Sequence, residues 1–527
     1  MQLSSDAETT TVPAPRAHVA DELTHREIME VLFGLLAALF TAILSSTIVS
    51  NALPTIIADL DGSQTQYTWV VTASLLAMTV STPIWGKLSD LVNKKVLVQV
   101  SIVVFVIGSI LAGLSRNLPE LIAMRVVQGI AMGGLTANAQ SIIGSIIPPR
   151  QRGRYSGYMG ATMAVATVSG PLLGGLIVDT PGLGWRWTFF VCVPLAVISL
   201  VVLQKYLRIA TIRRHVDFDY LGAVLIAIAA SLPLLWVTFA GDSFDWVSWQ
   251  SAAFIAGTVL AAVLLVLVEL RHDEPLLPIA VVRERTTALA IIGSIAVGIA
   301  MFGGSVFIGQ YFQVAGGRTP TEAGLLTIPL MLGSLFGTLL SGQLITRYGR
   351  WKRFLVIGSV SLIVGLGLLS TIDHRTPEWH AMAFIAFVGI GMGMLLQNYV
   401  LAVQNTVDVS QVGASSATVA FFRSLGGAVG VSVLGAILAA QVKDDVTTKL
   451  SALGVSSSGG SGSLLDVKSL PPQVAEIVRE AYGDATGTIF LVAACVAVLS
   501  LVTALLIREV PLRLTVNKQV DAEVDAQ

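Results

Sequence analysis

The sequence predicts an all-α integral membrane protein with fourteen transmembrane helices, built as two six-helix bundles with two further helices inserted between them. Three observations lead to this prediction. The chain of 527 residues is 54% hydrophobic and only 12% charged, and that charged fraction is about half of what a soluble domain carries. Fourteen apolar runs are long enough to cross a bilayer. Glycine-rich motifs recur at a nearly constant offset, which divides the chain into two related halves.

Each predicted span offers roughly the 20 apolar residues that a helix needs to cross the hydrocarbon core. The runs lie at residues 31–51, 67–86, 96–114, 119–147, 155–178, 186–204, 218–240, 249–269, 288–313, 322–345, 354–371, 379–405, 413–440 and 487–507. The nine tryptophans lie at or near the ends of these runs, where an aromatic belt belongs.

Basic residues in the connecting segments predict the orientation of the spans. With the N-terminus inside, the inner segments hold 22 of the 32 Lys and Arg residues and the outer loops hold 7. Because cytoplasmic loops are enriched in Lys and Arg, we expect both termini in the cytoplasm and a multi-pass protein of the cell membrane.

The spans also predict the organisation of the chain. We expect a cytoplasmic polar tail (1–30), a first six-helix bundle (31–207), two inserted helices with cytoplasmic linkers (208–287), a second six-helix bundle (288–507) and a cytoplasmic tail (508–527). The second bundle would contain a long outer loop, 441–486, with the flexible stretch SSSGGSGS. A small helix is predicted within that loop at 473–482.

Two pairs of segments carry the internal repeat. GKLSDLVNKK (86–95) follows the second run and GQLITRYGRWK (342–352) follows the tenth, 256 residues later. GIAMGGLTAN (129–138) and GIGMGMLLQN (389–398) are 260 residues apart, so that Asn138 corresponds to Asn398. Repeated halves with a substrate site between them are typical of secondary transporters.

The first pair predicts tight turns that control the contact between the halves. The first copy offers Gly86, Asp90, Lys94 and Lys95, and the second copy offers Gly342, Arg347, Gly349 and Arg350. Asn93 stands where the second copy has Gly349, and asparagine tolerates the left-handed conformation best after glycine. We expect Asp90 near a helix N-terminus, in pairs that break when the halves rock; a plain positive loop is the alternative.

Two further motifs lie inside spans. Arg125, Gln128 and Gly129 fall in the fourth run, and a buried arginine is functional by default unless it reaches the interface. The fifth run, GYMGATMAVATVSGPLLGG, has small residues that permit close helix packing and a proline that bends the helix. Its spaced positions are Gly157, Ala166, Gly170, Pro171, Gly174 and Gly175.

Together these motifs resemble the major facilitator superfamily, and within it the fourteen-span drug:proton antiporter family of the multidrug efflux type. The resemblance covers roughly residues 30–510. Three further stretches support it: WRWTFFVCVP (185–194), DFDYLG (217–222) and VGASSATVAFFRSLGGAVG (412–430). It implies export by alternating access, with the fifth-span motif typical of exporters and Arg125 tuning proton transfer.

The resemblance also implies what the protein works with. We expect no cofactor, the proton-motive force as energy source, and a small amphiphilic drug or metabolite as substrate, exchanged for protons by a monomer in a lipid bilayer. The net charge of −1 gives no indication of a nucleic-acid partner. No catalytic or metal-binding motif appears, so an enzyme is not expected.

One residue departs from the family pattern. In LSSTIVSNALP (44–54) of the first run, Ser45 replaces the usual acid. None of the 33 acids lies at the middle of a run, and coupling to protons usually needs a group whose pKa can change. Asp179 and Glu322, near the outer ends of runs, are the candidate replacements.

Two other interpretations stay open. Arg125 and Arg423 could bind an anionic metabolite that carries the exchangeable proton itself, or the protein could be a facilitator that is not coupled through a first-span acid. Import is the nearest rival to export. Polar residues expected at the central cavity are Ser45, Asn51, Arg125, Gln128, Asn138, Gln310, Gln397, Asn398 and Arg423.

Overall fold

The computed structural model describes residues 25–60, 64–147, 149–180, 182–207, 219–240, 244–272, 275–277, 279–318, 320–407, 411–452 and 472–512. Within these ranges the regular structure is helical, apart from one isolated bridge between Ala240 and Phe244. Eleven helices of this part are long and apolar enough to cross a membrane. The all-α prediction is confirmed. The physical reason is that a bilayer offers no hydrogen-bond partners to the backbone, so a spanning segment pairs its N–H and C=O groups within the helix.

The helices fall into two groups with a hairpin between them. The first group holds α1 (His25–Asp59), α2 (Gln64–Leu91), α3 (Lys94–Gly113), α4 (Leu118–Ile146), α5 (Pro149–Asp179), α6 (Trp187–Phe190) and α7 (Cys192–Tyr206). The hairpin is α8 (Tyr220–Phe239) and α9 (Trp249–Glu269). The second group holds α10 (Ile279–Val282), α11 (Arg285–Gln310), the π-helix η1 (Tyr311–Ala315), α12 (Pro320–Leu326), α13 (Ile328–Tyr348), α14 (Lys352–Leu369), α15 (Glu378–Thr406), α16 (Val412–Ala452) and α17 (Pro472–Leu506).

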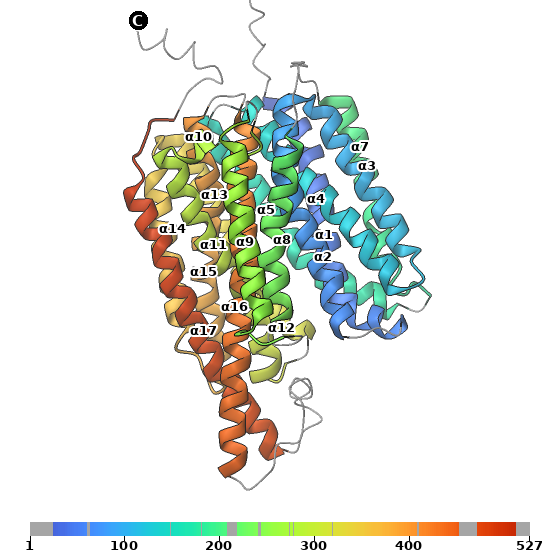
Figure 1. The fold of residues 1–527 in the computed structure, drawn as a ribbon, viewed down its shortest axis with the longest axis vertical. Coiled ribbons are helices and arrows are strands. Elements are labelled where there is room, and N and C mark those ends of the chain that lie inside the picture. The colour runs from blue at the N-terminus through green and yellow to red at the C-terminus, as the bar shows by residue number, and fades with distance from the viewer. Residues whose placement is uncertain are drawn as a thin grey trace, which may run out of the picture.

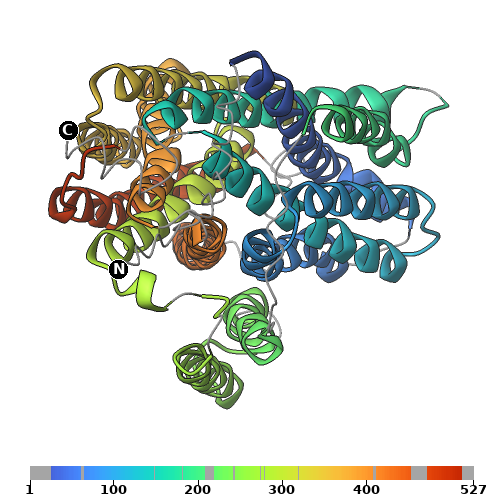
Figure 2. The same ribbon diagram turned by 90° about the horizontal axis from the view of Figure 1, so that it is seen from above.

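The two groups pack in the same way. In the first, α4 lies between α2 and α3, and α1 packs on α5 and α7. In the second, α15 lies between α13 and α14, and α11 packs on α16 and α17. Figure 1 shows the groups side by side, and Figure 2 shows the α8–α9 hairpin outside them, where α8 packs against α2 and α16 and α9 packs on α8.

The glycine repeat predicted from the sequence is present in the packing. A Cβ on Gly129 would overlap the Ser74 carbonyl oxygen of α2, and a Cβ on Gly389 would overlap the Leu330 carbonyl oxygen of α13. Without a hydrophobic driving force between helices in lipid, such close backbone contact is what holds them together. Each group is therefore a tightly packed unit.

The predicted outer loop 441–486 is largely helical instead. Helix α16 continues to Ala452 and α17 begins at Pro472, so that 473–482 is the start of α17 rather than a separate small helix. The two extensions stabilise each other, because Val446 and Val478 share one apolar cluster and Lys449 pairs with Glu480 at 3.1 Å. They project beyond the rest of the molecule in Figure 1.

Other predicted boundaries differ less from those in the structure. Helix α1 begins at His25, within the expected tail 1–30, and runs on to Asp59, beyond the end of the expected span. The stretch SSSGGSGS and the tail residues 513–527 lie outside the described residues.

The repeat allows a direct test of the packing. Gly389→Ala places a methyl group against the α13 backbone, and overpacking of this kind costs about 1–3 kcal/mol. We expect the thermal unfolding midpoint of the purified protein to fall by several degrees. The matched control is Gly367→Ala, because a Cβ on Gly367 meets nothing within 4 Å; equal midpoints for the two variants would contradict the packing argument.

Candidate functional site

The two groups are joined by one carboxylate at the end of the molecule where α2 ends and α16 begins, called here the basic end. Asp90 of α2 accepts hydrogen bonds from the backbone N–H of Gly413 (2.9 Å) and of Ala414 (2.7 Å). The first N–H groups of a helix have no intrahelical acceptor and carry partial positive charge. The predicted placement of Asp90 at a helix N-terminus is confirmed, and we call this contact the latch.

Small residues let α2 and α16 come close enough to form the latch. A Cβ on Gly86 would overlap Ala417, and a Cβ on Gly413 would overlap both Ser89 and Asp90. The glycine that opens the motif therefore works together with a glycine of the opposite group.

The turn after the latch does not have the conformation expected for Asn93. Asn93 has φ −59°, and its side chain caps α3 by accepting a hydrogen bond from the Lys95 N–H at 2.9 Å. Gly349, its counterpart, has φ +69° and ends α13 in the left-handed conformation. The left-handed conformation predicted for Asn93 is wrong. The chain reverses here with Asn93 at negative φ, and the Asn93 side chain caps the start of α3 instead.

The basic residues of the two copies have different surroundings. Lys94 Nζ reaches the Ser141 carbonyl oxygen (3.5 Å) and Lys95 Nζ reaches the Gln204 carbonyl oxygen (2.7 Å), so both lysines bind the C-terminal turns of neighbouring helices. In the second copy, Gly342 is buried, Arg347 and Arg350 are exposed, and the Arg347 guanidinium lies 5.6 Å from the centre of the Tyr348 ring.

Other contacts between the groups also gather toward the basic end. Gln140 donates to Gln397 across the interface at 3.4 Å. A Cβ on Gly157 of α5 would lie 3.2 Å from Leu339 of α13. The described contacts therefore close the interface at the basic end.

The paired asparagines face inward within their own groups. Asn138 donates to the Ser101 hydroxyl at 3.3 Å, and Asn398 donates to the Met394 carbonyl oxygen of its own helix at 2.6 Å. Both side chains are buried. Each of these two hydrogen bonds stays within one group.

The fifth-run motif serves both kinds of packing. Gly157 faces the second group, whereas a Cβ on Gly170 would overlap Thr47 of α1 in the same group. Gly174 is buried. The side chains of Pro171 and position Gly175 lie outside the described part.

Arg125 is the most deeply placed charge of the first group. It is 1% exposed, about 10 Å along α4 from its first residue. Its Nε donates to the Val70 carbonyl oxygen (3.2 Å), its terminal nitrogen donates to Gln128 Oε1 (3.0 Å), and Gln128 donates to the Ser109 hydroxyl (2.9 Å). Backbone and amide oxygens, not a carboxylate, satisfy the guanidinium in the part of the chain that is described.

The other predicted site residues are dispersed. Ser45 is fully buried in the first group, beside Cys192 of α7. Arg423 lies partly exposed in α16, about 16 Å along that helix. Glu322 is exposed in the first turn of α12. The side chains of Asn51 and Asp179 lie outside the description.

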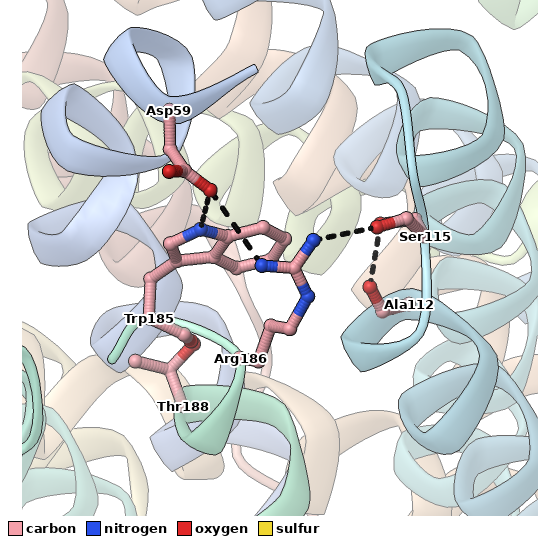
Figure 3. A network of polar contacts seen from close by, with 6 residues as sticks. All are labelled: Asp59, Ala112, Ser115, Trp185, Arg186 and Thr188. Carbon is pink, nitrogen blue, oxygen red and sulfur yellow. Dashed lines mark hydrogen bonds and ion pairs between the residues drawn. The ribbon is translucent and has the colours of Figure 1, made fainter. Parts of the chain in front are cut away.

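A second polar network, which the sequence did not predict, lies at the opposite end of the molecule. Asp59 at the end of α1 accepts a hydrogen bond from Trp185 Nε1 (2.7 Å) and pairs with Arg186 at 3.5 Å. Arg186 also donates to the Ser115 carbonyl oxygen (3.2 Å) and lies over the Trp185 ring (Figure 3). This network ties α1 to the start of α6 within the first group.

Comparison with known proteins adds close sequence relatives. The family model described as Major Facilitator Superfamily matches residues 35–431. An uncharacterised MFS-type transporter of Mycobacterium tuberculosis strain H37Rv is 34% identical over 92% of this chain and 69% of the relative. The multidrug transporter protein MdtP of Bacillus subtilis is 33% identical over 80% of this chain and 77% of the relative. Multidrug resistance protein 3 of the same organism is 28% identical over 90% and 94%.

Solved structures share the fold. The proton:xylose symporter XylE has a TM-score of 0.58 at 14% identity, covering 90% of this chain and 95% of that chain. The human organic anion transporter MFSD10 has a TM-score of 0.58 at 12% identity, covering 89% and 99%. At these identities the similarity concerns the fold alone.

The latch predicts a measurable change in accessibility. Asp90→Asn removes the charge and leaves one acceptor for two N–H donors, and hydrogen bonds to charged groups are worth about 1.5–3 kcal/mol. We expect Ser89→Cys, which is buried against Gly413, to react with a maleimide several-fold faster when Asp90 is also replaced. The reporter is introduced after Cys192 and Cys495 have been replaced by serine.

The control for this experiment is Asp484→Asn, which changes an exposed carboxylate of α17. Labelling of the reporter should stay unchanged in that background. Labelling that is equally slow with Asp90 and with Asn at position 90 contradicts the latch.

Proposed function

Because the chain belongs to the Major Facilitator Superfamily, whose members are membrane transporters and not enzymes, we propose that it exports small amphiphilic molecules by alternating access, driven by the proton gradient. Export, the substrate class and proton coupling are the parts that need testing. The fourteen-span drug:proton antiporter type is the subfamily that this proposal assigns.

The latch is the observation that supports alternating access. At the basic end it joins two tightly packed groups through a carboxylate and two backbone N–H groups, and such a contact can break without disturbing either group. Relatives named as a multidrug transporter, a multidrug resistance protein and an efflux pump support export of varied small molecules.

The distribution of basic residues supports the proposed orientation. Lys94, Lys95, Arg347 and Arg350 lie at the basic end, and cytoplasmic loops are enriched in such residues. We place this end and both termini in the cytoplasm, in the cell membrane, with the protein working as a monomer. The latched state would then be closed to the cytoplasm.

The proposed coupling group is a carboxylate outside the first span. Ser45 cannot titrate and lies within the first group. Glu322 lies at the opposite end, within electrostatic reach of Arg318, and Asp179 ends α5 near the same side. Both belong to helices that contact each other across the groups, where a change of charge would affect the interface.

Export of an anionic metabolite is the second candidate, and Arg423 is the observation that favours it. Arg423 is a partly exposed residue well inside α16, whereas the Arg125 guanidinium is occupied by hydrogen bonds to Val70 and Gln128. A facilitator without proton coupling remains the third candidate, and import the fourth.

Transport in inside-out vesicles tests these candidates. A cationic dye and an anionic amphiphile are supplied outside vesicles with an acidic interior, with and without an uncoupler. We expect accumulation that the uncoupler abolishes. Accumulation only in right-side-out vesicles indicates import. Substrate entry that stops at equal concentrations inside and outside, with and without the uncoupler, indicates a facilitator.

The same assay separates the proposed coupling residues. If one of these acids carries the coupled proton, its amide variant (Asp179→Asn or Glu322→Gln) will lower proton-driven accumulation at least tenfold. Exchange between unlabelled and labelled substrate will continue in that variant. Glu120→Gln is the control, because Glu120 is also an exposed acid at a helix start at this end. Full activity of both amide variants would exclude a relocated acid at these positions.

The Arg125 network generates a separate prediction. Arg125→Lys keeps the positive charge, but one ammonium group cannot reproduce the fork that reaches both Val70 and Gln128. We expect the rate of transport to fall about tenfold, as for the loss of about 1.4 kcal/mol. The exposed Arg116→Lys should transport at the original rate, and an equal rate for Arg125→Lys would show that charge alone suffices.

A further inference from the structure

Two carboxylates are buried together at the basic end of the α8–α9 hairpin. Asp219 is the residue before α8 and Glu269 is the last residue of α9, and each is only 2% exposed. They lie 50 residues apart in the chain, and the antiparallel hairpin brings them to the same end. Ionised carboxylates are rarely buried without partners.

One oxygen of each carboxylate has a structural role. Asp219 Oδ1 accepts a hydrogen bond from the Gly222 N–H at 2.7 Å and so caps α8. Glu269 Oε2 accepts a hydrogen bond from the Leu277 N–H at 3.2 Å and holds the segment that follows α9. These bonds explain why acidic or amide side chains stand here, but they use only half of each group.

The second oxygen of each carboxylate is buried without a hydrogen-bond partner among the described residues. These atoms are Asp219 Oδ2 and Glu269 Oε1. Both adjoin the same small space beside Gly222: a Cβ on Gly222 would overlap Asp219 Oδ2 and would lie 3.0 Å from Glu269 Oε1. The absence of a side chain at Gly222 therefore lets the two unpartnered oxygens face one space.

Two buried negative charges that face one small space repel each other, and within the described part of the chain neither free oxygen has a donor. A single proton removes both costs, because it neutralises one group and supplies a donor for the other. We propose that Asp219 and Glu269 share one proton and form a proton-binding site between the α8–α9 hairpin and α2. The inference rests on this geometry and does not depend on the proposed export function.

The charged surroundings of the site are limited. From α2, Lys87 is 8% exposed and acts electrostatically on Glu269 and also on Asp90. On the segment after α9, Arg271 is exposed and His272 follows it. An apolar cluster around the hairpin carries no charge. It is formed by residues of α2, α8, α9, α16 and the segment after α9: Val80, Leu225, Ile226, Leu265, Leu276, Leu277, Phe421, Phe422 and Leu425.

The position of Lys87 connects the proton site to the latch. Lys87 follows Gly86, which packs on α16, and precedes Asp90 by three residues. Loss of the shared proton adds one negative charge on the hairpin side of Lys87 and draws its ammonium group away from Asp90. Protonation of the pair thus controls the charge balance beside the contact that joins the two groups.

Infrared difference spectroscopy of the purified full chain during a pH step tests the site. A buried protonated carboxyl has a C=O stretch separate from that of a carboxylate. We expect this band at neutral pH, and we expect both Asp219→Asn and Glu269→Gln to abolish it, because the introduced amide donates to the remaining carboxylate. Asparagine still caps a helix and the glutamine oxygen still accepts a hydrogen bond, so both variants should fold.

The outcomes separate the proposal from its rivals. Loss of the band in both variants, with the band retained in Asp484→Asn, supports the shared proton. A band that survives in either variant overturns sharing. Stabilisation of the original protein by sodium relative to choline, absent from both variants, would instead indicate a metal cation between the carboxylates and overturn the proposal.

A further measurement does not rely on changing the carboxylates. Lys87→Met removes the cation that favours ionisation, so the band should persist to higher pH than in the original protein. A band with an unchanged pH dependence, or one that disappears at lower pH, contradicts the proposed arrangement.

Discussion

The arrangement of the two groups depends on the contact between the carboxylate of Asp90, on α2, and the first backbone N–H groups of α16. It joins them through hydrogen bonds to backbone N–H groups that no helix can satisfy internally. Each such bond to a charged group is worth about 1.5–3 kcal/mol, which is enough to favour one arrangement and small enough to be broken repeatedly. Gly86 and Gly413 make the contact possible by removing the side chains that would separate the helices.

Packing within each group has a different physical basis. Helices in lipid gain little from hiding apolar side chains, so their contact relies on dispersion between closely spaced backbones. Gly129 of α4, packed against α2, and Gly389 of α15, packed against α13, provide this contact in corresponding places. Close packing resists deformation, so the proposed alternating access requires the groups to move as units, with the change concentrated where they meet.

The titratable carboxylates singled out above lie at the ends of the helices. Ser45 leaves the first span without a titratable group, and Arg125 is held by oxygens of its own group. Among the described residues, Asp219 and Glu269 at the hairpin, next to α2, are buried carboxylates with incomplete partners. A proton bound there would act on the interface through Lys87, without a change inside either bundle.

The positions of the helices and the latch motif could be predicted from the chain. A bilayer demands about 20 apolar residues for each crossing, so hydropathy alone locates the spans, and the repeat at offsets of 256 and 260 residues identifies the related halves. The motif with Asp90 was recognisable because its glycine, acid and bases are adjacent in sequence. The extension of α16 to Ala452 was not, because its polar sequence is stabilised by pairing with α17.

By itself, then, the sequence determined the membrane fold, the two halves and the motif that carries Asp90, since these follow from local composition and spacing. The tertiary structure decided which side chains meet. Hydropathy does not set the rotation of a helix, so only packing placed Ser45 beside Cys192. Only the closure of a hairpin brought Asp219 to Glu269 across 50 residues, with one glycine leaving room for both.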